Sequence, residues 1–279
     1  MSSKIQLKGF NNIGNTCYLN SGLQLIIQNK DICNIIYQNK DNSNILKKLA
    51  QFINDYYTSN FNSITPNYIK QLIDNKNSIF HGNTQNDAGE FLIYFLDIIN
   101  TEINNNIFEI KINITIKCKL SSCLNTSSHI ETNNFLILDI NDNTNTLDDC
   151  YRDYKKRVKL ENENAYFCSI CKAHRIASKR LEIINWPKHL IIWLKRFHII
   201  RNKYNKNCKE IIIPIEWRHN YNLKAIIYHS GNLYSGHYVY IGKYNNKWYL
   251  YDDDSVSEIN EIQLNQFKNN AYILYYNLD

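Results

Sequence analysis

A thiol, an imidazole and a carboxylate lie at opposite ends of this 279-residue chain, and this separation constrains its fold more than any other feature. Cys17 stands near the start, whereas His237 and three consecutive aspartates at 252–254 stand near the end. Hydrolysis by a cysteine nucleophile uses all three groups, because the imidazole removes the thiol proton and the carboxylate holds the imidazole in place. If the three groups act together, the chain must fold so that its N-terminal segment contacts its C-terminal segment. A chain of this length is long enough to bury a core around such a site.

The sequence around Cys17 predicts the first turn of a helix. Residues 17–28 carry apolar side chains at helical spacing, and Asn15 or Thr16 can cap the start of this helix. The apolar residues are Leu19, Leu23, Ile26 and Ile27. The positive end of a helix dipole stabilises anions, so we expect this position to favour the thiolate form. A turn over residues 14–16 precedes the helix, and we expect it to present the Cys17 side chain to solvent.

Hydrolysis at a carbonyl group also needs hydrogen-bond donors for the oxyanion that forms. The backbone amide of Cys17 is one candidate, and the side chain of Asn12 on the incoming loop is another. In a chain so rich in asparagine, a turn-forming role for Asn12 is the plainer interpretation. Cys33, Cys150 and Cys208 lack a comparable context and are interpreted as small buried hydrophobic residues.

Residues 238–251 predict a β-hairpin closed by two asparagines, which tolerate the positive φ of a tight turn. Counting outward from this turn, His237 lies diagonal to Asp252 and opposite Asp254 on one face of the sheet. Diagonal neighbours stand about 7–8 Å apart at Cα, within reach of an imidazole and a carboxylate. Asp253 is expected to point to the other face. The spacing alone therefore allows either Asp252 or Asp254 as the partner of His237.

The rest of the pattern places helices first and strands afterwards. Apolar residues at helical spacing predict further helices at residues 45–57, 66–74 and 87–99. Residues 110–116 alternate as a half-buried strand, and we expect residues 135–140 to pair with it, followed by a polar loop at 141–146. Further strands are expected at 190–197, 211–215, 223–228, 238–243, 248–251 and 272–276. This order predicts an α+β protein with segregated layers.

Two cysteine pairs lie in the strand-rich middle of the chain. Cys118 and Cys123 form a CxxxxC motif, Cys168 and Cys171 form a CxxC motif, and each pair lies at the end of a predicted strand. Two such turns can form a closed tetrahedral site of four thiolates, and a metal site without an open position is structural. We therefore expect one structural zinc ion per chain and no cofactor for catalysis. Free thiols or a disulfide are the alternatives.

Composition excludes several classes of protein. The chain has 44% hydrophobic and 21% charged residues, which is typical of a soluble globular protein. Its net charge is +6, and its densest basic run, residues 155–159, is interpreted as a solvated face, so no nucleic-acid partner is expected. No apolar run approaches the length of a membrane span, and the N-terminus lacks the apolar core of a signal peptide, so no membrane partner is expected. A core this large does not need disulfides, so we expect reduced thiols in the cytoplasm or the nucleus.

Several segments, taken in order along the chain, match motifs of one known family. Residues 9–21 (GFNNIGNTCYLNS) match its Cys box, and residues 229–238 match its His box. Residues 85–91 (QNDAGEF) resemble its QDAxEF helix, although Asn86 replaces the usual second Gln. Further matches are residues 186–190 with 194–197, residues 248–253 and residues 271–276. The chain thus resembles the ubiquitin-specific proteases, the papain-like class of deubiquitinating enzymes, from about residue 9 to residue 277.

The resemblance implies an α+β, papain-like cysteine protease fold with a thumb, a palm and zinc-tipped fingers. Residues 1–279 would form a single catalytic domain, with the thumb at about 8–108, the fingers at 109–185 and the palm at 186–279. It implies a thiol-dependent deubiquitinase, a cysteine isopeptidase that cleaves after the C-terminal glycine of ubiquitin on proteins or polyubiquitin chains. Its partners would be ubiquitin and ubiquitinated proteins, and the enzyme would act as a monomer.

The resemblance also implies a role for each candidate residue. Cys17 would be the nucleophile, His237 the general base and then the general acid, and Asp252 the carboxylate that orients His237. Asp253 would help as a second carboxylate, and Asn12 would donate to the oxyanion. This analogy selects Asp252 as the partner of His237, whereas the spacing leaves Asp254 open.

The remaining implied roles concern the substrate and the metal. Asp87 and Glu90, three residues apart on one helix face, would meet the arginines of the ubiquitin tail, and Tyr238 would line the channel for its two terminal glycines. The zinc ligands would be Cys118, Cys123, Cys168 and Cys171, where CxxxxC replaces one CxxC of the family. Two alternatives stay open: a hydrolase for another ubiquitin-like modifier, and a catalytically inactive ubiquitin-binding module.

Overall fold

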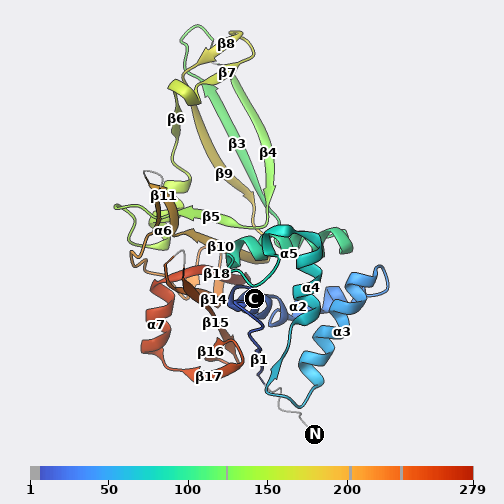
Figure 1. Ribbon diagram of the computed structural model, residues 1–279. Helices are drawn as coiled ribbons and strands as arrows, with labels where there is room; N and C mark the ends of the chain where they lie inside the picture. Colours follow the sequence, from blue (N-terminus) through green and yellow to red (C-terminus); the bar gives the residue numbers. More distant parts are fainter. Residues whose placement is uncertain (1–6, 124, 201–202, 233–234, 279) are drawn as a thin grey trace.

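The computed structural model describes residues 7–123, 125–200, 203–232 and 235–278 (Figure 1). Helices occupy the first hundred residues and strands most of the rest, so the α+β prediction is confirmed. A helical part and a large sheet form the body, and a long narrow sheet projects from it (Figure 1). We call residues 7–108 the thumb, the large sheet the palm, and the projecting strands the fingers. Within the described ranges, no helix is long and apolar enough to cross a membrane.

The thumb consists of helices around a fully buried central helix. Its elements are β1 Gly9–Phe10, α1 Cys17–Ile27, α2 Lys30–Gln38, α3 Asn44–Thr58, β2 Ser63–Ile64, α4 Asn67–Lys76, η1 Ser78–Phe80 and α5 Ala88–Ile103. Helix α1 is buried along its whole length because it lies between the palm and the other thumb helices. The four helices predicted in this region are confirmed to within a few residues. The sequence missed α2, a short helix in which only Ile32, Cys33 and Ile36 are buried.

The palm is an eight-stranded sheet with the order β17-β16-β15-β14-β18-β10-β5, in which β13 also pairs with β14. Its strands are β5 Leu136–Asp139, β10 His189–Lys195, β13 Glu216–Trp217, β14 Tyr221–Gly231, β15 Gly236–Tyr244, β16 Lys247–Asp252, β17 Ser255–Ile259 and β18 Ala271–Leu278. Strand β18 runs antiparallel to both of its neighbours, β14 and β10. The last strand of the chain therefore lies in the middle of the sheet.

A hydrophobic core covers each face of the palm, because side chains alternate between the two faces of a strand. From β10, Ile191 joins the core shared with the thumb, and Ile192 joins a second core that includes side chains of α6 (Leu147–Tyr154) and α7 (Glu261–Asn269). Helix α1 contacts β14 and β15 on the first of these faces. This packing holds the helix that begins at Cys17 against the strand that carries His237.

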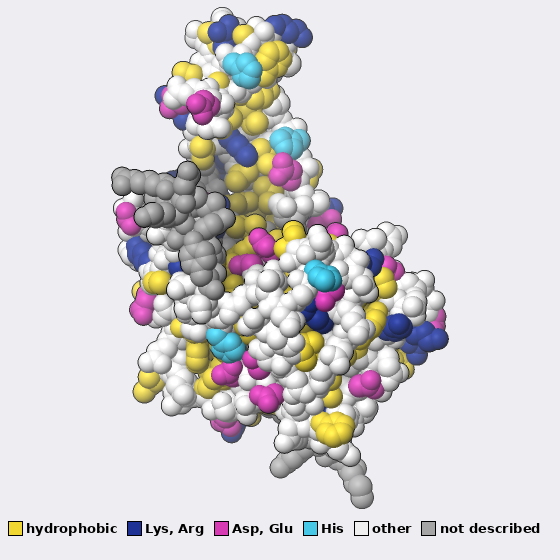
Figure 2. All heavy atoms as spheres, in the orientation of Figure 1, with side chains coloured by type: hydrophobic (Ala, Val, Ile, Leu, Met, Phe, Trp, Pro, Cys, Tyr) yellow, Lys and Arg dark blue, Asp and Glu magenta, His cyan; other side chains and the backbone are white. Residues whose placement is uncertain are grey.

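The fingers are a four-stranded sheet with the order β4-β3-β9-β6, followed by a small hairpin of β7 and β8. Their elements are β3 Ile110–Cys118, β4 Thr126–Asn133, β6 Val158–Leu160, η2 Asn162–Asn164, β7 Tyr166–Cys168, β8 Ala173–Arg175 and β9 Ala177–Asn185. Hydrophobic side chains run along the side of the fingers seen in Figure 2, down towards the body. β11 Phe197–Ile200 and β12 Lys203–Lys206 form a separate two-stranded ribbon.

Two strand predictions are wrong. Residues 135–140 do not pair with residues 110–116, because β3 pairs with β4 and β9 while β5 pairs in parallel with β10 of the palm. β5 and α6 therefore interrupt the range 109–185 that was expected to form the fingers. Residues 211–215 form no strand beyond a single bridge at Ile212, since Ile211 and Ile213 fill the second core and Pro214 lacks the amide that a ladder needs.

Candidate active site

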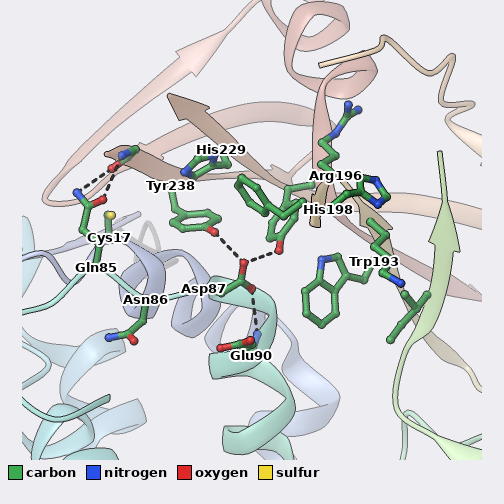
Figure 3. Close-up of a pocket in the computed structure, with 15 residues that line it drawn as sticks. Cys17, Gln85, Asn86, Asp87, Glu90, Trp193, Arg196, His198, His229 and Tyr238 are labelled. Atoms are coloured by element: carbon green, nitrogen blue, oxygen red, sulfur yellow. Dashed lines mark hydrogen bonds between the residues drawn. The ribbon is translucent and has the colours of Figure 1, made fainter. Parts of the chain in front are cut away.

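Cys17 is the first residue of α1, and a folded loop fixes the start of this helix. The side-chain oxygen of Asn12 accepts hydrogen bonds from the amides of Gly14 and Thr16, each at 3.1 Å. Gly14 has φ of +112°, a conformation that other residues rarely adopt, which explains a glycine there. The predicted helix start is confirmed, but the expected exposure of Cys17 is wrong, because its side chain is only 4% exposed. The side chain instead lines a cavity (Figure 3).

The predicted hairpin supplies the imidazole and the carboxylate. β15 and β16 pair in the expected register, from Tyr244 opposite Lys247 to Tyr240 opposite Tyr251. Beyond the last pair, the Nε2 atom of His237 lies 2.6 Å from the Oδ1 atom of Asp252. The structure thus pairs His237 with Asp252, the choice that spacing alone left open.

Cys17 and His237 meet across the boundary between thumb and palm. The Cys17 thiol lies within hydrogen-bonding distance of the His237 imidazole, and this contact is the largest cause that raises the pKa of His237 to about 9. Burial opposes this shift, and the hydrogen bond with Asp252 adds to it. A thiol, an imidazole and a carboxylate are therefore in contact in the order that proton transfer from a cysteine requires.

Asp253 connects the palm to the thumb. Its Oδ2 atom accepts from the Asn12 amide and its Oδ1 atom accepts from the Asn20 amide, each at 2.8 Å. Its backbone oxygen accepts from the Phe10 amide at 2.7 Å. We expected Asp253 to point to the face of the sheet opposite His237, and this is wrong. Strand β16 ends at Asp252, and Asp253 lies in a turn with φ of +50°. Asn20 was missed, since a buried helical asparagine gives no signal of a partner 233 residues away.

A cavity of about 560 Å³ extends from Cys17 between the thumb and the palm (Figure 3). Its lining includes three residues expected to contact a substrate: Asp87, Glu90 and Tyr238. Asp87 caps α5, because its Oδ1 atom accepts from the amides of Gly89 at 2.7 Å and of Glu90 at 3.1 Å. Asp87 is therefore the N-cap of α5, whereas we expected it within the helix, on the same face as Glu90.

The other carboxylate oxygen of Asp87 is also occupied. Its Oδ2 atom accepts from the hydroxyl of Tyr238 at 3.2 Å and from that of Tyr272 at 2.5 Å. Burial is the largest cause that raises the pKa of Asp87 and of Glu90. Glu90 is exposed, whereas both carboxylate oxygens of Asp87 accept from protein donors, so Glu90 is the more accessible acid of the two.

Comparison with known proteins identifies the family. A family model described as "Ubiquitin carboxyl-terminal hydrolase" matches residues 8–276. The chain belongs to this family. Among similar proteins are ubiquitin carboxyl-terminal hydrolase Usp2 of Drosophila melanogaster and probable ubiquitin carboxyl-terminal hydrolase 4 of Schizosaccharomyces pombe, each 26% identical over 97% and 96% of this chain, respectively. The chain spans 34% and 58% of the length of these two relatives.

Two solved structures share the fold of this chain. The SAGA DUB module of Ubp8, Sgf11, Sus1 and Sgf73 bound to monoubiquitin superimposes with a TM-score of 0.84 at 24% identity, over 100% of this chain and 70% of the matched chain. The same module bound to ubiquitin aldehyde gives a TM-score of 0.81 at 24% identity, over 100% and 72% of the two chains. The predicted papain-like fold with thumb, palm and fingers is therefore confirmed.

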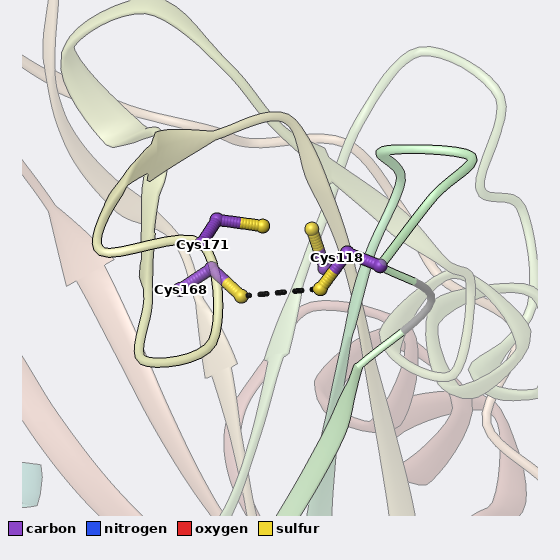
Figure 4. Close-up of side chains that lie close together, drawn as sticks. Cys118, Cys168 and Cys171 are labelled. Carbon is purple, nitrogen blue, oxygen red and sulfur yellow. Dashed lines mark hydrogen bonds between the residues drawn. The ribbon is translucent and has the colours of Figure 1, made fainter.

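This member of the ubiquitin carboxyl-terminal hydrolase family also gathers four cysteines at the end of its fingers (Figure 4). They are the four predicted from the sequence: Cys118, Cys123, Cys168 and Cys171. Their sulfur atoms all lie within 4.8 Å of one another, and the sulfurs of Cys123 and Cys168 are 3.7 Å apart, too far for a disulfide. The backbone amide of Cys171 is the largest cause that lowers the pKa of Cys168 to about 6, whereas the side chain of Cys123 is the largest cause that raises the pKa of Cys171 to about 12. This cluster could bind a metal ion.

Sequence reasoning missed a second histidine beside the site. The Nδ1 atom of His229 on β14 accepts from the Lys206 ammonium group at 2.9 Å, and Lys206 also donates to two backbone oxygens of β14. Burial is the largest cause that lowers the pKa of His229 to about 4, and Lys206 and His237 add to the shift. His229 is therefore neutral near pH 7 and supports the wall of the cavity rather than supplying charge.

Proposed function

We propose that this protein is a cysteine isopeptidase that hydrolyses the bond after the C-terminal glycine of ubiquitin. One observation supports the proposal most directly: the Cys17 thiol is hydrogen-bonded to His237, and the Nε2 atom of His237 lies 2.6 Å from the Oδ1 atom of Asp252. A ubiquitin-binding module without activity has no need for this arrangement. Membership of the ubiquitin carboxyl-terminal hydrolase family and the names of its relatives support ubiquitin as the substrate.

The proposed reaction proceeds through a thioester. His237 takes the proton of Cys17, and the sulfur attacks the carbonyl carbon of the terminal glycine. The imidazolium then gives this proton to the leaving amine as the C–N bond breaks, which leaves the glycine bound to sulfur. Water, deprotonated by His237, adds to the thioester, and the C–S bond breaks. The imidazolium returns its proton to the sulfur, and the glycine leaves as a carboxylic acid that ionises in water. Asp252 keeps the imidazole in the required orientation throughout.

The oxyanion of each step needs donors close to the sulfur. We assign this role to the backbone amide of Cys17 and to the side-chain amide of Asn12. The side-chain oxygen of Asn12 is held by the amides of Gly14 and Thr16, so its nitrogen is oriented by the loop itself. The hydrogen bond to Asp253 at 2.8 Å uses one of the two N–H groups of Asn12 and leaves the other for the substrate.

The lining of the cavity supports a substrate with an extended, basic tail. Glu90 offers an accessible carboxylate, whereas Asp87 is already bonded to protein donors through both oxygens. We therefore assign the contact with an arginine of the tail mainly to Glu90, and we assign to Asp87 the placement of Tyr238 at the channel. The hydrophobic side chains along the fingers in Figure 2 suit the folded body of ubiquitin.

We further propose that the four-cysteine cluster binds one zinc ion. With a Zn–S distance of about 2.3 Å, a tetrahedral site separates neighbouring sulfurs by about 3.8 Å. The separation of 3.7 Å between Cys123 and Cys168 fits this geometry. Four thiolate ligands leave no open position, so the ion would stabilise the fingers and take no part in catalysis. Elemental analysis should find about one zinc atom per chain, and its absence would contradict the assignment.

We also propose a reducing compartment, the cytoplasm or the nucleus, and a monomeric enzyme. The described cysteines, Cys17 among them, are free thiols, which suits such a compartment. Sedimentation of the purified protein at micromolar concentration checks the monomer, and a dimer would contradict it.

The function is tested with ubiquitin carrying a fluorogenic amine at its C-terminus. The wild type should release the fluorophore, Cys17→Ser should lower kcat by at least about 10³-fold, and both proteins should unfold at similar temperatures. An electrophilic ubiquitin probe should form one adduct, mapped to Cys17 by mass spectrometry. Turnover retained in C17S would rule out the assigned nucleophile. Faster reaction with another ubiquitin-like modifier would mean that this modifier, and not ubiquitin, is the substrate. Binding of the ubiquitin probe without formation of an adduct would indicate an inactive ubiquitin-binding module.

A further inference from the structure

The segment before α5 holds β15 on both sides of His237. The Gln85 side chain donates from Nε2 to the backbone oxygen of Gly236 at 3.2 Å, and its Oε1 atom accepts from the Gly236 amide at 3.1 Å (Figure 3). Two residues later, Asp87 accepts from the Tyr238 hydroxyl at 3.2 Å. Gly236 and Tyr238 are the immediate neighbours of His237, so the thumb holds the residue before His237 and the residue after it.

Gln85 binds the edge of β15 at Gly236, beyond the point where β16 stops pairing with β15. β15 is paired with β14 as far as Gly236, but its pairing with β16 ends at Tyr240. Gly236 therefore presents its amide and its carbonyl oxygen without a strand partner on that side. The primary amide of Gln85 satisfies both groups, as a backbone peptide of a further strand would.

The strand at Gly236 needs this external support. A Cβ atom at this position would lie 2.0 Å from Nε2 of His229, so the packing admits only glycine there. Glycine is the residue with the greatest backbone freedom, and it has no side chain to anchor the strand. The segment next to His237 is thus held by its pairing with β14 on one side and by Gln85 of the thumb on the other.

We propose that Gln85 is a positioning residue, which holds the strand of His237 so that the imidazole meets Cys17 across the boundary between thumb and palm. The inference rests on the proposed function, because it assigns Gln85 to the same reaction. Gln85 acts through its two hydrogen bonds with Gly236, the residue before His237. Its loss therefore lowers the rate of the chemical steps more than it weakens the binding of substrate.

Two variants and a control test the assignment. Gln85→Ala removes both hydrogen bonds, and Gln85→Glu keeps the acceptor for the Gly236 amide but sets a carboxylate oxygen against the Gly236 carbonyl. Gln51→Ala is the matched control, because Gln51 is exposed on α3 and bonds only to Asp55 nearby. With the fluorogenic ubiquitin substrate, Q85A and Q85E should lower kcat by about 10- to 100-fold while KM changes less than about threefold. Q51A should leave both constants unchanged.

A second measurement does not depend on ubiquitin. Alkylation of Cys17 by iodoacetamide, followed by mass spectrometry from pH 5 to pH 10, reports how the imidazole assists the thiol. Q85A and Q85E should lower the alkylation rate of Cys17 between pH 6 and pH 7 by about tenfold relative to the wild type and Q51A. Thermal unfolding of each variant shows that the protein is folded, and Q85E replaces Q85A if the alanine variant is not.

Three results would overturn the inference. The first is an unchanged kcat with an unchanged alkylation profile. The second is a raised KM with an unchanged kcat, which would make Gln85 a substrate contact. The third is a lowered kcat with an unchanged alkylation profile, which would mean that Gln85 acts on the substrate rather than on the cysteine and histidine. If the wild type does not cleave ubiquitin, the proposed function fails, and the alkylation profiles alone still decide the role of Gln85.

Discussion

The buried imidazole of His229 links the folding stability of this protein to pH. Its side chain is 6% exposed, and burial is the first cause that lowers its pKa to about 4 from an ordinary value of 6.5. As the pH falls below 6.5, the unfolded chain binds a proton at this residue before the folded chain does. The stability that His229 contributes is therefore complete above about pH 6.5 and is lost as the pH falls towards 4.

The size of this loss follows from the two pKa values. Linkage at a single site with a pKa of 6.5 in the unfolded chain and of about 4 in the folded chain removes about 2.5 kcal/mol of unfolding free energy between pH 7 and pH 4.5. Other groups titrate over the same range, so the loss is isolated by comparison with a variant. In His229→Asn, the amide oxygen can still accept from Lys206, but the residue no longer titrates.

Urea unfolding at pH 7, 6, 5 and 4.5, followed by tryptophan fluorescence, measures this effect. Between pH 7 and pH 4.5, H229N should lose about 2.5 kcal/mol less unfolding free energy than the wild type does. Any lower stability of H229N that does not depend on pH cancels in this comparison. His81→Asn, which removes an exposed imidazole, serves as the control and should follow the wild type. Equal losses in H229N and the wild type would refute the reasoning.

Four further results are expected. In an NMR titration, the midpoint of His237 near pH 9 should fall in Asp252→Asn, because the carboxylate that favours the imidazolium is lost; an unmoved midpoint argues against their pairing. Asp87→Ala should lower the unfolding free energy in urea by about 2–5 kcal/mol, since a helix cap and an acceptor for two tyrosine hydroxyls disappear. A loss below about 0.5 kcal/mol would contradict this structural role. Lys8→Met should cost about 1–3 kcal/mol in the same assay, because the buried ammonium group, 1% exposed, donates to two carbonyls near the end of α3; equal stability would show that these bonds contribute nothing net. Cys123→Ser should lower the zinc content and the thermal midpoint together, and full zinc retention would remove Cys123 from the ligand set.

Local patterns in the sequence predicted the parts of the site that local physics controls. The register of the hairpin from Tyr240 to Tyr251 follows from a two-residue turn and from alternation, both of which lie within a few residues. The helix that begins at Cys17 follows from its apolar spacing in the same way. Both cysteine pairs could be recognised as candidate metal ligands because two closely spaced cysteine pairs are typical of structural zinc sites.

The errors concern features that distant residues decide. The place of Asp253 depends on where β16 ends, and this end depends on a left-handed turn and on Asn12 and Asn20 from the thumb. β4 is exposed on almost all of its residues, so it lacks the alternation by which strands are recognised. Gln85 contacts Gly236, which lies 151 residues away, and no sequence pattern near either residue predicts that contact.

The position of β18 between β14 and β10 sets the order of events during protein synthesis. The ribosome releases Cys17 early, but β14 and β10 gain their common neighbour only when residues 271–278 have been translated. At about 5–20 residues per second, roughly 10–50 s separate the emergence of the nucleophile from that of this strand. During this interval the nascent chain carries its nucleophilic sulfur without a complete palm to supply the base. The palm can hold the base beside the nucleophile only after residues 271–278 have left the ribosome.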